Sequence, residues 1–195
     1  MKIVNTKTLA KNKFLDFKLT EYVDQKGNTK YWTWVSRPNG IKAVVIAAIV
    51  DKGYYNNPNG GGYLRDLRLV VIKEFRVPFG EYEYSIPAGL IDEGEDIVGA
   101  ATRELYEETG LKIKSILRVS PFVYNSAGLS DEAVSMVYAE CEGDISKVGH
   151  EDSEDIEVFL MNQNEVIKLL EDNTKKFSAK FWIIAQYFAR NNSIL

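Results

Sequence analysis

Cysteine and histidine are almost absent from this chain, whose 195 residues include one of each. A lone Cys141 cannot form an intrachain disulfide, so we expect a reducing compartment and an inert thiol. His150 lies in a polar stretch at residues 147–152 and is predicted to be a surface loop residue, without the partners of a catalytic triad or a zinc site. A disulfide scaffold and a histidine-based active site are therefore excluded.

Long apolar runs are also missing. No stretch reaches the roughly 18 apolar residues of a membrane-spanning helix, and residues 1–7 lack a sustained apolar run, so we expect a cytoplasmic protein without membrane contact. The formal net charge is −4 and the pI is near 5.2, so no broad nucleic-acid-binding face is expected. The length and the 45 % hydrophobic content fit one globular domain, with or without an appendage.

The most informative segment, residues 89–111, reads GLIDEGEDIVGAATRELYEETGL. It predicts a helix that starts after Gly94 and ends at Gly110, because glycine suits the left-handed residue that terminates a helix. At about 100° per residue, Glu104, Glu107 and Glu108 fall within roughly 100° of one another. Three carboxylates are therefore expected to share one face of this helix.

These carboxylates are not expected on an ordinary solvated stripe, because apolar residues of the predicted helix point into or beside the same arc. Clustered, partly buried carboxylates repel one another and are poorly solvated. Such clusters are usually neutralised by a hard divalent cation, and ligation by oxygen alone favours Mg²⁺ or Mn²⁺ over zinc. The alternative is a surface helix with an i,i+4 pair between Arg103 and Glu107, which leaves Gly89 and the acidic loop at residues 92–95 unexplained.

The residue types at nine positions of this segment form a recognisable pattern. They are Gly89, Glu95, Arg103, Glu104, Leu105, Glu107, Glu108, Gly110 and Leu111. Their spacing, GX₅EX₇REUXEEXGU with U an aliphatic residue, resembles the signature of the Nudix hydrolases at every fixed position. The resemblance implies an α/β fold, the Nudix-type α/β/α sandwich with a mixed sheet. It also implies hydrolysis of a nucleoside diphosphate linked to another group.

The same resemblance implies roles for the residues of the motif. Glu104 and Glu108 correspond to metal ligands, and Glu107 to a ligand or a group that orients the attacking water. The carbonyl of Ala88 is a further candidate ligand, and Arg103 holds the glutamates in place. These roles suit a pyrophosphate diester, whose negative charge must be neutralised before a nucleophile approaches; Mg²⁺ ions that bridge phosphate oxygens lower that barrier and acidify a bound water.

Residues 1–40 are expected to form an N-terminal antiparallel, strand-rich extension before a Nudix domain at residues 41–195. Residues 27–37 resemble the N-terminal hairpin of ADP-ribose pyrophosphatases, in which a tryptophan stacks on adenine and an arginine meets the phosphates. Trp32 and Arg37 take these positions; the alternative for Trp32 is a core or dimer contact. Members of this subfamily exchange such elements between subunits, so the resemblance also implies a homodimer whose extensions complete the adenine sites.

A second arginine lies at the end of a predicted strand. Residues 73–78 and 86–92 resemble a subfamily segment in which an arginine faces the substrate phosphates, and Arg76 matches it. A guanidinium is a planar, permanently charged donor suited to phosphate. The alternative is a salt bridge from Arg76 to the glutamate cluster. Glu74 stands where glutamine is usual and Ser85 where glutamate is usual, so the contacts of those two positions are not carried over.

Residues 125–132, NSAGLSDE, resemble the Ser-Pro-Gly-x-Ser/Thr-Asp-Glu loop of ADP-ribose pyrophosphatases. The terminal glutamate of that loop is a candidate general base, and Glu132 holds its place. A loop carboxylate beside metal ions still accepts a proton from a water that the metals acidify; the alternative is an ordinary exposed acid. Ala127 stands where the subfamily has its marker proline, so this loop departs from the subfamily pattern at one position.

Strand patterns predict a hairpin of residues 14–24 and 30–37 and further strands at residues 42–50, 64–75, 83–86, 113–123, 133–140 and 156–161. Helical spacing predicts two more helices at residues 164–170 and 177–190. Residues 51–62, rich in glycine and asparagine, are predicted to be a flexible loop.

The sequence thus predicts a hydrolase dependent on Mg²⁺ or Mn²⁺ that cleaves a nucleoside diphosphate sugar, most of all ADP-ribose, to AMP and ribose 5-phosphate. Alternatives in the same class are hydrolysis of GDP-mannose, a dinucleoside polyphosphate or a nucleoside triphosphate. A module that senses ADP-ribose without cleaving it is the alternative from another class, although such modules commonly lose glutamates that are all present here. The expected partners are a nucleotide sugar and a second copy of the chain, not nucleic acid.

Overall fold

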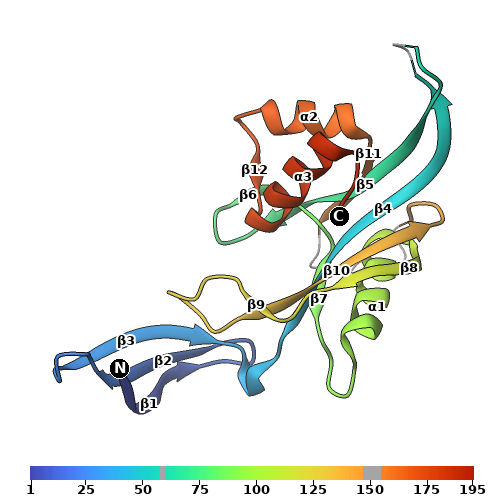
Figure 1. The fold of residues 1–195 in the computed structure, drawn as a ribbon. Coiled ribbons are helices and arrows are strands. Elements are labelled where there is room, and N and C mark those ends of the chain that lie inside the picture. Colours follow the sequence, from blue (N-terminus) through green and yellow to red (C-terminus); the bar gives the residue numbers. More distant parts are fainter. Residues whose placement is uncertain (58–59, 147–154) are drawn as a thin grey trace.

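The computed structural model describes residues 1–57, 60–146 and 155–195, which form two β-sheets and three α-helices (Figure 1). A small sheet projects from one end of a larger body that holds all three helices. His150 lies outside the described residues, so its predicted place in a surface loop stays a prediction.

The small sheet is an antiparallel meander in the order β1-β2-β3. Its strands are β1 (Lys2–Lys11), β2 (Asp16–Val23) and β3 (Thr29–Ser36), followed by a 3-10 turn, η1 (Pro38–Gly40). The pairing of β2 with β3 confirms the predicted hairpin. The sequence did not single out β1, because all ten of its residues are exposed and no buried apolar face marks it.

The large sheet has nine strands, mostly antiparallel, with parallel pairs between β4 and β10 and between β6 and β12. Six of them follow the order β12-β6-β5-β4-β10-β8, while β11 pairs with β5, β7 with β4 and β9 with β10. The bounds are β4 (Ala43–Asn56), β5 (Tyr63–Arg76), β6 (Glu81–Ser85), β7 (Ala88–Leu90), β8 (Lys112–Val119), β9 (Val123–Tyr124), β10 (Ala133–Glu142), β11 (Ile156–Met161) and β12 (Lys176–Phe177).

Helices cover both faces of this sheet (Figure 1). Side chains alternate between the faces along a strand, and in β4 the set Val44, Ile46, Ala48 and Val50 packs with α1 (Ile97–Thr109). The other set, Val45, Ala47 and Ile49, packs with α2 (Gln163–Glu171) and α3 (Ala179–Asn191). Because residues 44–50 of β4 are buried on both faces, they form a continuous apolar run in the sequence. The predicted α/β/α sandwich with a mixed sheet is confirmed.

Local capping fixes both ends of α1, the predicted helix. The side chain of Asp96 accepts a hydrogen bond of 2.7 Å from the N–H of Gly99, which starts the helix. Gly110 follows the last turn with φ +76° and donates its N–H to the carbonyl of Tyr106. The predicted start after Gly94 and end at Gly110 are therefore confirmed.

The predicted flexible loop at residues 51–62 is wrong for its first half. Strand β4 continues to Asn56 and pairs with β5, so the connection is limited to residues 57–62. A register shift between Asp51 and Tyr54 makes this pairing workable: Gly53 has φ +93°, and its N–H donates to Asp51 Oδ1 at 2.8 Å. Glycine in this stretch marks a bulge within a strand rather than a loop.

Two predicted boundaries also differ. The strand predicted at residues 113–123 is divided into β8 and β9. Between them, the hydroxyl of Ser120 accepts the N–H of Met136, and Pro121 has no N–H to donate to a neighbouring strand. The helix predicted at residues 177–190 begins at Ala179, because Ser178 caps it while Phe177 pairs in β12. Short β7, which passes next to α1, was not predicted.

The single thiol is buried in β10, and burial raises the pKa of Cys141 to about 12. The thiolate is the reactive form of cysteine, so this side chain is inert at neutral pH, as predicted. Within the described ranges, no helix is both long and apolar enough to cross a membrane.

Candidate active site

The three glutamates of the motif, called here the box glutamates (Glu104, Glu107 and Glu108), lie on α1. Glu108 is buried, with 8 % of its surface exposed. The side chain of Glu104 is 15 % exposed and that of Glu107 is 44 % exposed. Two carboxylates are thus withdrawn from solvent against the sheet, and the third is at the rim.

Strand β7 explains why the motif begins with a glycine. A Cβ atom on Gly89 would lie 1.9 Å from Cδ of Glu104 and about as close to both of its carboxylate oxygens. A side chain at position 89 would fit only if the Glu104 carboxylate moved, so glycine lets the β7 backbone pass over this carboxylate in its present position. One residue earlier, the N–H of Ala88 donates to Glu108 Oε2 at 3.3 Å. The backbone of β7 and the box glutamates therefore form one compact unit, called here the box unit.

The guanidinium of Arg103 binds this unit from the side. It has five N–H donors, and these make contacts of 2.8–3.1 Å with both carboxylate oxygens of Glu95, with Glu104, with Glu107 and with the carbonyl of Leu90. The bond from Arg103 is the main cause that lowers the pKa of Glu95, and the same bond is the main cause that raises the pKa of Arg103. The i,i+4 pair of an ordinary surface helix is present, but it is only one of these contacts.

The donor set of this unit suits a hard divalent cation, because it consists of carboxylate and backbone oxygens without nitrogen or sulfur. In the present arrangement Arg103 holds Glu104 and Glu107, and within residues 1–57, 60–146 and 155–195 no three acidic, histidine or cysteine side chains converge as metal ligands do.

Glu132 lies at the end of the loop before β10 and is held at both oxygens. Arg37 donates from Nε to Glu132 Oε1 at 3.2 Å, and Asn125 donates from Nδ2 to Glu132 Oε2 at 2.7 Å. The side chains of Arg37 and Glu132 are 31 % and 28 % exposed. The arginine predicted to meet phosphate is therefore a partner of the glutamate predicted to act as base.

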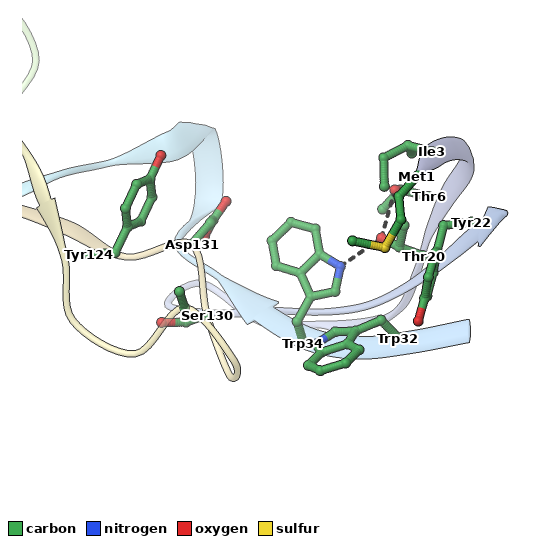
Figure 2. A pocket seen from close by; sticks show the side chains of 11 residues that line it. Met1, Ile3, Thr6, Thr20, Tyr22, Trp32, Trp34, Tyr124, Ser130 and Asp131 are labelled. Carbon is green, nitrogen blue, oxygen red and sulfur yellow. Dashed lines mark hydrogen bonds between the residues drawn. The ribbon is translucent and has the colours of Figure 1, made fainter. Parts of the chain in front are cut away.

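The same loop contacts the small sheet through Trp32. Its indole N–H donates to the carbonyl of Gly128 at 3.2 Å, while 49 % of the residue stays exposed. Trp32 and Trp34 line a cavity of about 550 Å³ together with Tyr124 and Asp131. Figure 2 shows both tryptophans on β3 and the other two side chains across from them. An apolar cavity with two indole rings is thus placed between the extension and the loop.

Arg76 lies at the end of β5 and is paired with acids of its own sheet. It donates from Nη1 to Glu74 at 2.6 Å and from Nε to Glu83 at 3.3 Å. The alternative of a salt bridge to the glutamate cluster is therefore wrong for these contacts, because both partners lie on β5 and β6 and are not box glutamates. Ser85, at the other unusual position, bonds the hydroxyl of Ser178 at 3.0 Å.

Sequence reasoning missed two residues of this region, Lys180 and Asn125. Lys180, in the first turn of α3, donates from Nζ to Asn125 Oδ1 at 3.0 Å. Burial lowers the pKa of Lys180, while the charges of Glu132 and Glu83 act in the opposite direction. Asn125 was within a recognised loop, but no motif includes Lys180, and a lysine at a helix start carries no signal of its own.

The sheet brings the loop and the box unit to the same region. Ala88 of β7 and Met136 of β10 both have Val45 of β4 as their register partner, one on each side of it. Two strand spacings amount to about 10 Å, and Glu132 comes only four positions before Met136. Strand β7 of the box unit and the strand that follows the Glu132 loop therefore flank the start of β4.

Comparison with known proteins assigns the family. The model of the NUDIX domain matches residues 57–181, which is more than half of the chain. The sandwich fold and the carboxylate helix define a Nudix-type hydrolase, and this chain belongs to the Nudix family. Nudix hydrolases generally use divalent metal ions.

Named relatives align along most of the chain. The ADP-ribose pyrophosphatase of Bacillus subtilis is 30 % identical over 194 residues, which cover 96 % of this chain and 94 % of that protein. The ADP-ribose pyrophosphatase of Saccharomyces cerevisiae is 30 % identical over 95 % of this chain and 89 % of its own length. The mouse ADP-sugar pyrophosphatase is 28 % identical over 87 % of this chain and 77 % of its own length.

A solved structure supports the fold. The crystal structure of an ADP compounds hydrolase superposes with a TM-score of 0.72 at 22 % identity, covering 97 % of this chain and 91 % of the other. At this identity the likeness bears on the fold alone.

Proposed function

We propose that this Nudix hydrolase cleaves the pyrophosphate of ADP-sugars, with ADP-ribose as the main substrate and AMP and ribose 5-phosphate as products. The observation that carries the proposal is the box unit, in which two withdrawn carboxylates lie against a glycine-permitted backbone strand. Three relatives that span most of the chain are named for ADP-ribose or ADP-sugar hydrolysis. The complete set of box glutamates favours an enzyme over a sensing module.

The cofactor in this proposal is Mg²⁺, with Mn²⁺ as a substitute, held by Glu104, Glu107, Glu108 and the carbonyl of Ala88. The oxygen-only donor set supports this choice. When bound, the ion neutralises pyrophosphate oxygens and lowers the pKa of a water. Arg103 anchors the glutamates through its contacts with Glu104 and Glu107.

Glu132 is the general base in this proposal. It takes a proton from the attacking water while the water oxygen forms a new bond to phosphorus, and the bridging P–O bond breaks with its electron pair leaving on the departing phosphate. Each carboxylate oxygen has two lone pairs, so the bonds from Arg37 and Asn125 leave Glu132 able to accept that proton.

Three side chains are proposed to bind the substrate. Trp32 stacks on adenine, and the exposed indole beside the cavity supports this role. Arg37 and Arg76 bind phosphate oxygens through planar donor groups. Both arginines already have carboxylate partners, so each must keep or exchange a contact when the substrate enters.

One experiment identifies the preferred substrate and distinguishes an enzyme from a sensing module. The purified protein is incubated with Mg²⁺ and, in turn, ADP-ribose, ADP-glucose, GDP-mannose, a diadenosine polyphosphate and a nucleoside triphosphate, with released monophosphate measured in the presence and absence of EDTA. We expect the highest kcat/KM for ADP-ribose and loss of turnover with EDTA. Preference for another compound would replace the substrate and retain the chemistry, and binding of ADP-ribose without turnover would indicate a sensor.

Replacing Trp32 with alanine is expected to raise KM for ADP-ribose about 10-fold while kcat changes little. Stacking of one base on an aromatic ring contributes about 1–3 kcal/mol, and an interaction of equal strength in ground and transition states appears in KM alone. Steady-state kinetics measure both constants.

Two further variants interpret that result. Trp32→Phe keeps a ring but loses the N–H bond to Gly128, so it separates stacking from loop attachment. Tyr63→Ala removes an aromatic residue of β5 that is 72 % exposed and is not among the residues that line the cavity, and serves as the control. An unchanged KM for Trp32→Ala would assign Trp32 to structure instead.

We also propose a cytoplasmic homodimer in which residues 1–40 mediate assembly for the Nudix domain at residues 41–195 and complete the adenine site. Exposed apolar side chains on the small sheet support this, since Ile3 and Tyr31 are 65 % and 62 % exposed. Light scattering at micromolar concentration should give twice the chain mass of 22.1 kDa. A monomeric mass would contradict the assembly.

A further inference from the structure

Lys180 belongs to a short series of hydrogen bonds that ends at the proposed general base. Its ammonium donates to Asn125 Oδ1 at 3.0 Å, and Asn125 Nδ2 donates to Glu132 Oε2 at 2.7 Å. A backbone bond from the N–H of Asn125 to the carbonyl of Glu132, 3.1 Å long, closes the loop between these two residues. The side chain and the main chain of Asn125 therefore both contact Glu132.

The chemistry of the two outer groups fixes the orientation of the amide between them. An ammonium only donates hydrogen bonds, and an ionised carboxylate only accepts them. The oxygen of Asn125 must therefore face Lys180, and its NH₂ group must face Glu132. A flipped amide would place an oxygen against the carboxylate and N–H groups against the ammonium, losing both bonds. Lys180 thus selects the one orientation in which Asn125 can hold Glu132.

The backbone of Lys180 is itself held firmly. It follows the N-cap residue Ser178, whose hydroxyl accepts from the N–H of Phe181 and is bonded to Ser85 of β6. Phe181 is fully buried in the core between the sheet and the helices. The ammonium therefore projects from a rigid helix start toward the loop, rather than from a mobile surface segment.

Lys180 lies among acidic and basic groups that act on its charge in opposite directions. It is half-buried, and desolvation lowers its pKa, while Glu132 and Glu83 favour the charged form and Arg76 opposes it. On its other oxygen, Glu132 is bonded to Arg37 from the small sheet. The carboxylate is thus held between the N-terminal extension and the C-terminal helix.

We propose that Lys180 is a positioning residue for the hydrolysis, acting through Asn125 to fix the carboxylate of Glu132 where it accepts the proton of the attacking water. This inference rests on the proposed function, since it requires Glu132 to act in turnover. It assigns a role to α3, an element that carries no part of the Nudix motif. The competing role for Lys180 is direct contact with substrate phosphate. Arg76, which is proposed to bind phosphate, is close enough for its charge to lower the pKa of Lys180.

The test compares Lys180→Met with Lys180→Arg, each alone and in an Asn125→Ala background, using ADP-ribose and saturating Mg²⁺. Loss of a hydrogen-bonding partner behind a metal ligand lowers activity about 10- to 100-fold. By analogy, Lys180→Met should lower kcat by about that factor and leave KM nearly unchanged. Lys180→Arg should recover part of the loss. In the Asn125→Ala background, Lys180→Met should have no further effect, because the hydrogen bonds that join Lys180 to Glu132 are already lost.

Three controls make the outcome decisive. Lys175→Met removes a lysine five positions earlier whose exposed pair with Asp172 contributes little, and should behave as wild type. Thermal unfolding checks that each variant folds. The side-chain amide signals of Asn125 in ¹H–¹⁵N spectra, which do not depend on turnover, should shift in Lys180→Met.

Each result has a distinct meaning. Wild-type kcat in Lys180→Met, or equal losses in the presence and absence of Asn125, would overturn the inference, while a rise in KM alone would assign Lys180 to substrate binding. Absence of turnover in the wild-type protein would overturn the proposed function and this inference together; an active wild type with an unaffected Lys180→Met variant would overturn the inference alone.

Discussion

Glutamine at position 108 is expected to reduce kcat for ADP-ribose by about 10²- to 10³-fold at saturating Mg²⁺. Glu108 is the most buried box glutamate, so its charge contributes to the metal site with little screening by solvent. Charge stabilisation by a metal ion amounts to several kcal/mol, and about 1.4 kcal/mol corresponds to a tenfold change in rate. Removing one ligand charge should therefore lower turnover far more than it alters folding.

The fold should survive Glu108→Gln, because the amide oxygen of glutamine can still accept the N–H of Ala88. The measurement is kcat against Mg²⁺ concentration, together with thermal unfolding. Glu93→Gln makes the same chemical change at an exposed position of the acidic loop and should leave both unchanged. Full activity of Glu108→Gln at saturating Mg²⁺ would remove Glu108 from the metal site.

Alanine at position 89 is expected to lower kcat by about 10²-fold or more without altering any charge. The added Cβ would lie 1.9 Å from Cδ of Glu104, so the carboxylate or β7 must move. The end of a glutamate side chain is the easier of the two to displace, and its pair with Arg103 at 2.8 Å would break. Because catalytic groups must be held closely to their productive geometry, activity should fall while the protein remains folded.

The control for this variant is Gly99→Ala on α1 itself, where the new Cβ would lie 3.2 Å from Asp96 Oδ1. A small shift of that side chain relieves this contact, and alanine has the higher helix propensity. A second test combines Gly89→Ala with Glu104→Gln. If Gly89 acts only by making room for Glu104, the combined loss should be no larger than that of the greater single variant. Near wild-type activity of Gly89→Ala would contradict the close passage of β7.

Local sequence was sufficient for the elements that carry their own signals. Asp96 and Gly110 define the ends of α1, because a capping side chain and a left-handed glycine act within one turn. The spacing of the box glutamates places them on one helix face for the same local reason. The hairpin of β2 and β3 was also predictable, since Gly27 with φ +84° stands in a short turn between two β-forming runs.

Local sequence was not sufficient where distant pairing overrode it. The segment from Asp51 to Asn56 has the composition of a loop, yet it is a strand because β5 supplies partners and a bulge at Gly53 absorbs the extra residue. Strand β1 is exposed throughout, so only its register with β2 defines it. In both cases the hydrogen bonds of another strand, and not side-chain periodicity, decide the structure.

The sequence by itself determined the family, the carboxylate helix and the chemistry of oxygen ligands, because all of these depend on residue types at fixed short spacings. Only the tertiary structure decided which distant side chains meet. Arg37 contacts Glu132 across 95 positions, and Lys180 contacts Asn125 across 55. Such contacts depend on how the two sheets and the helix layers pack, and helix or strand periodicity extends only within one element. The motif therefore identifies the reaction, while the packing identifies the residues that hold its proposed base.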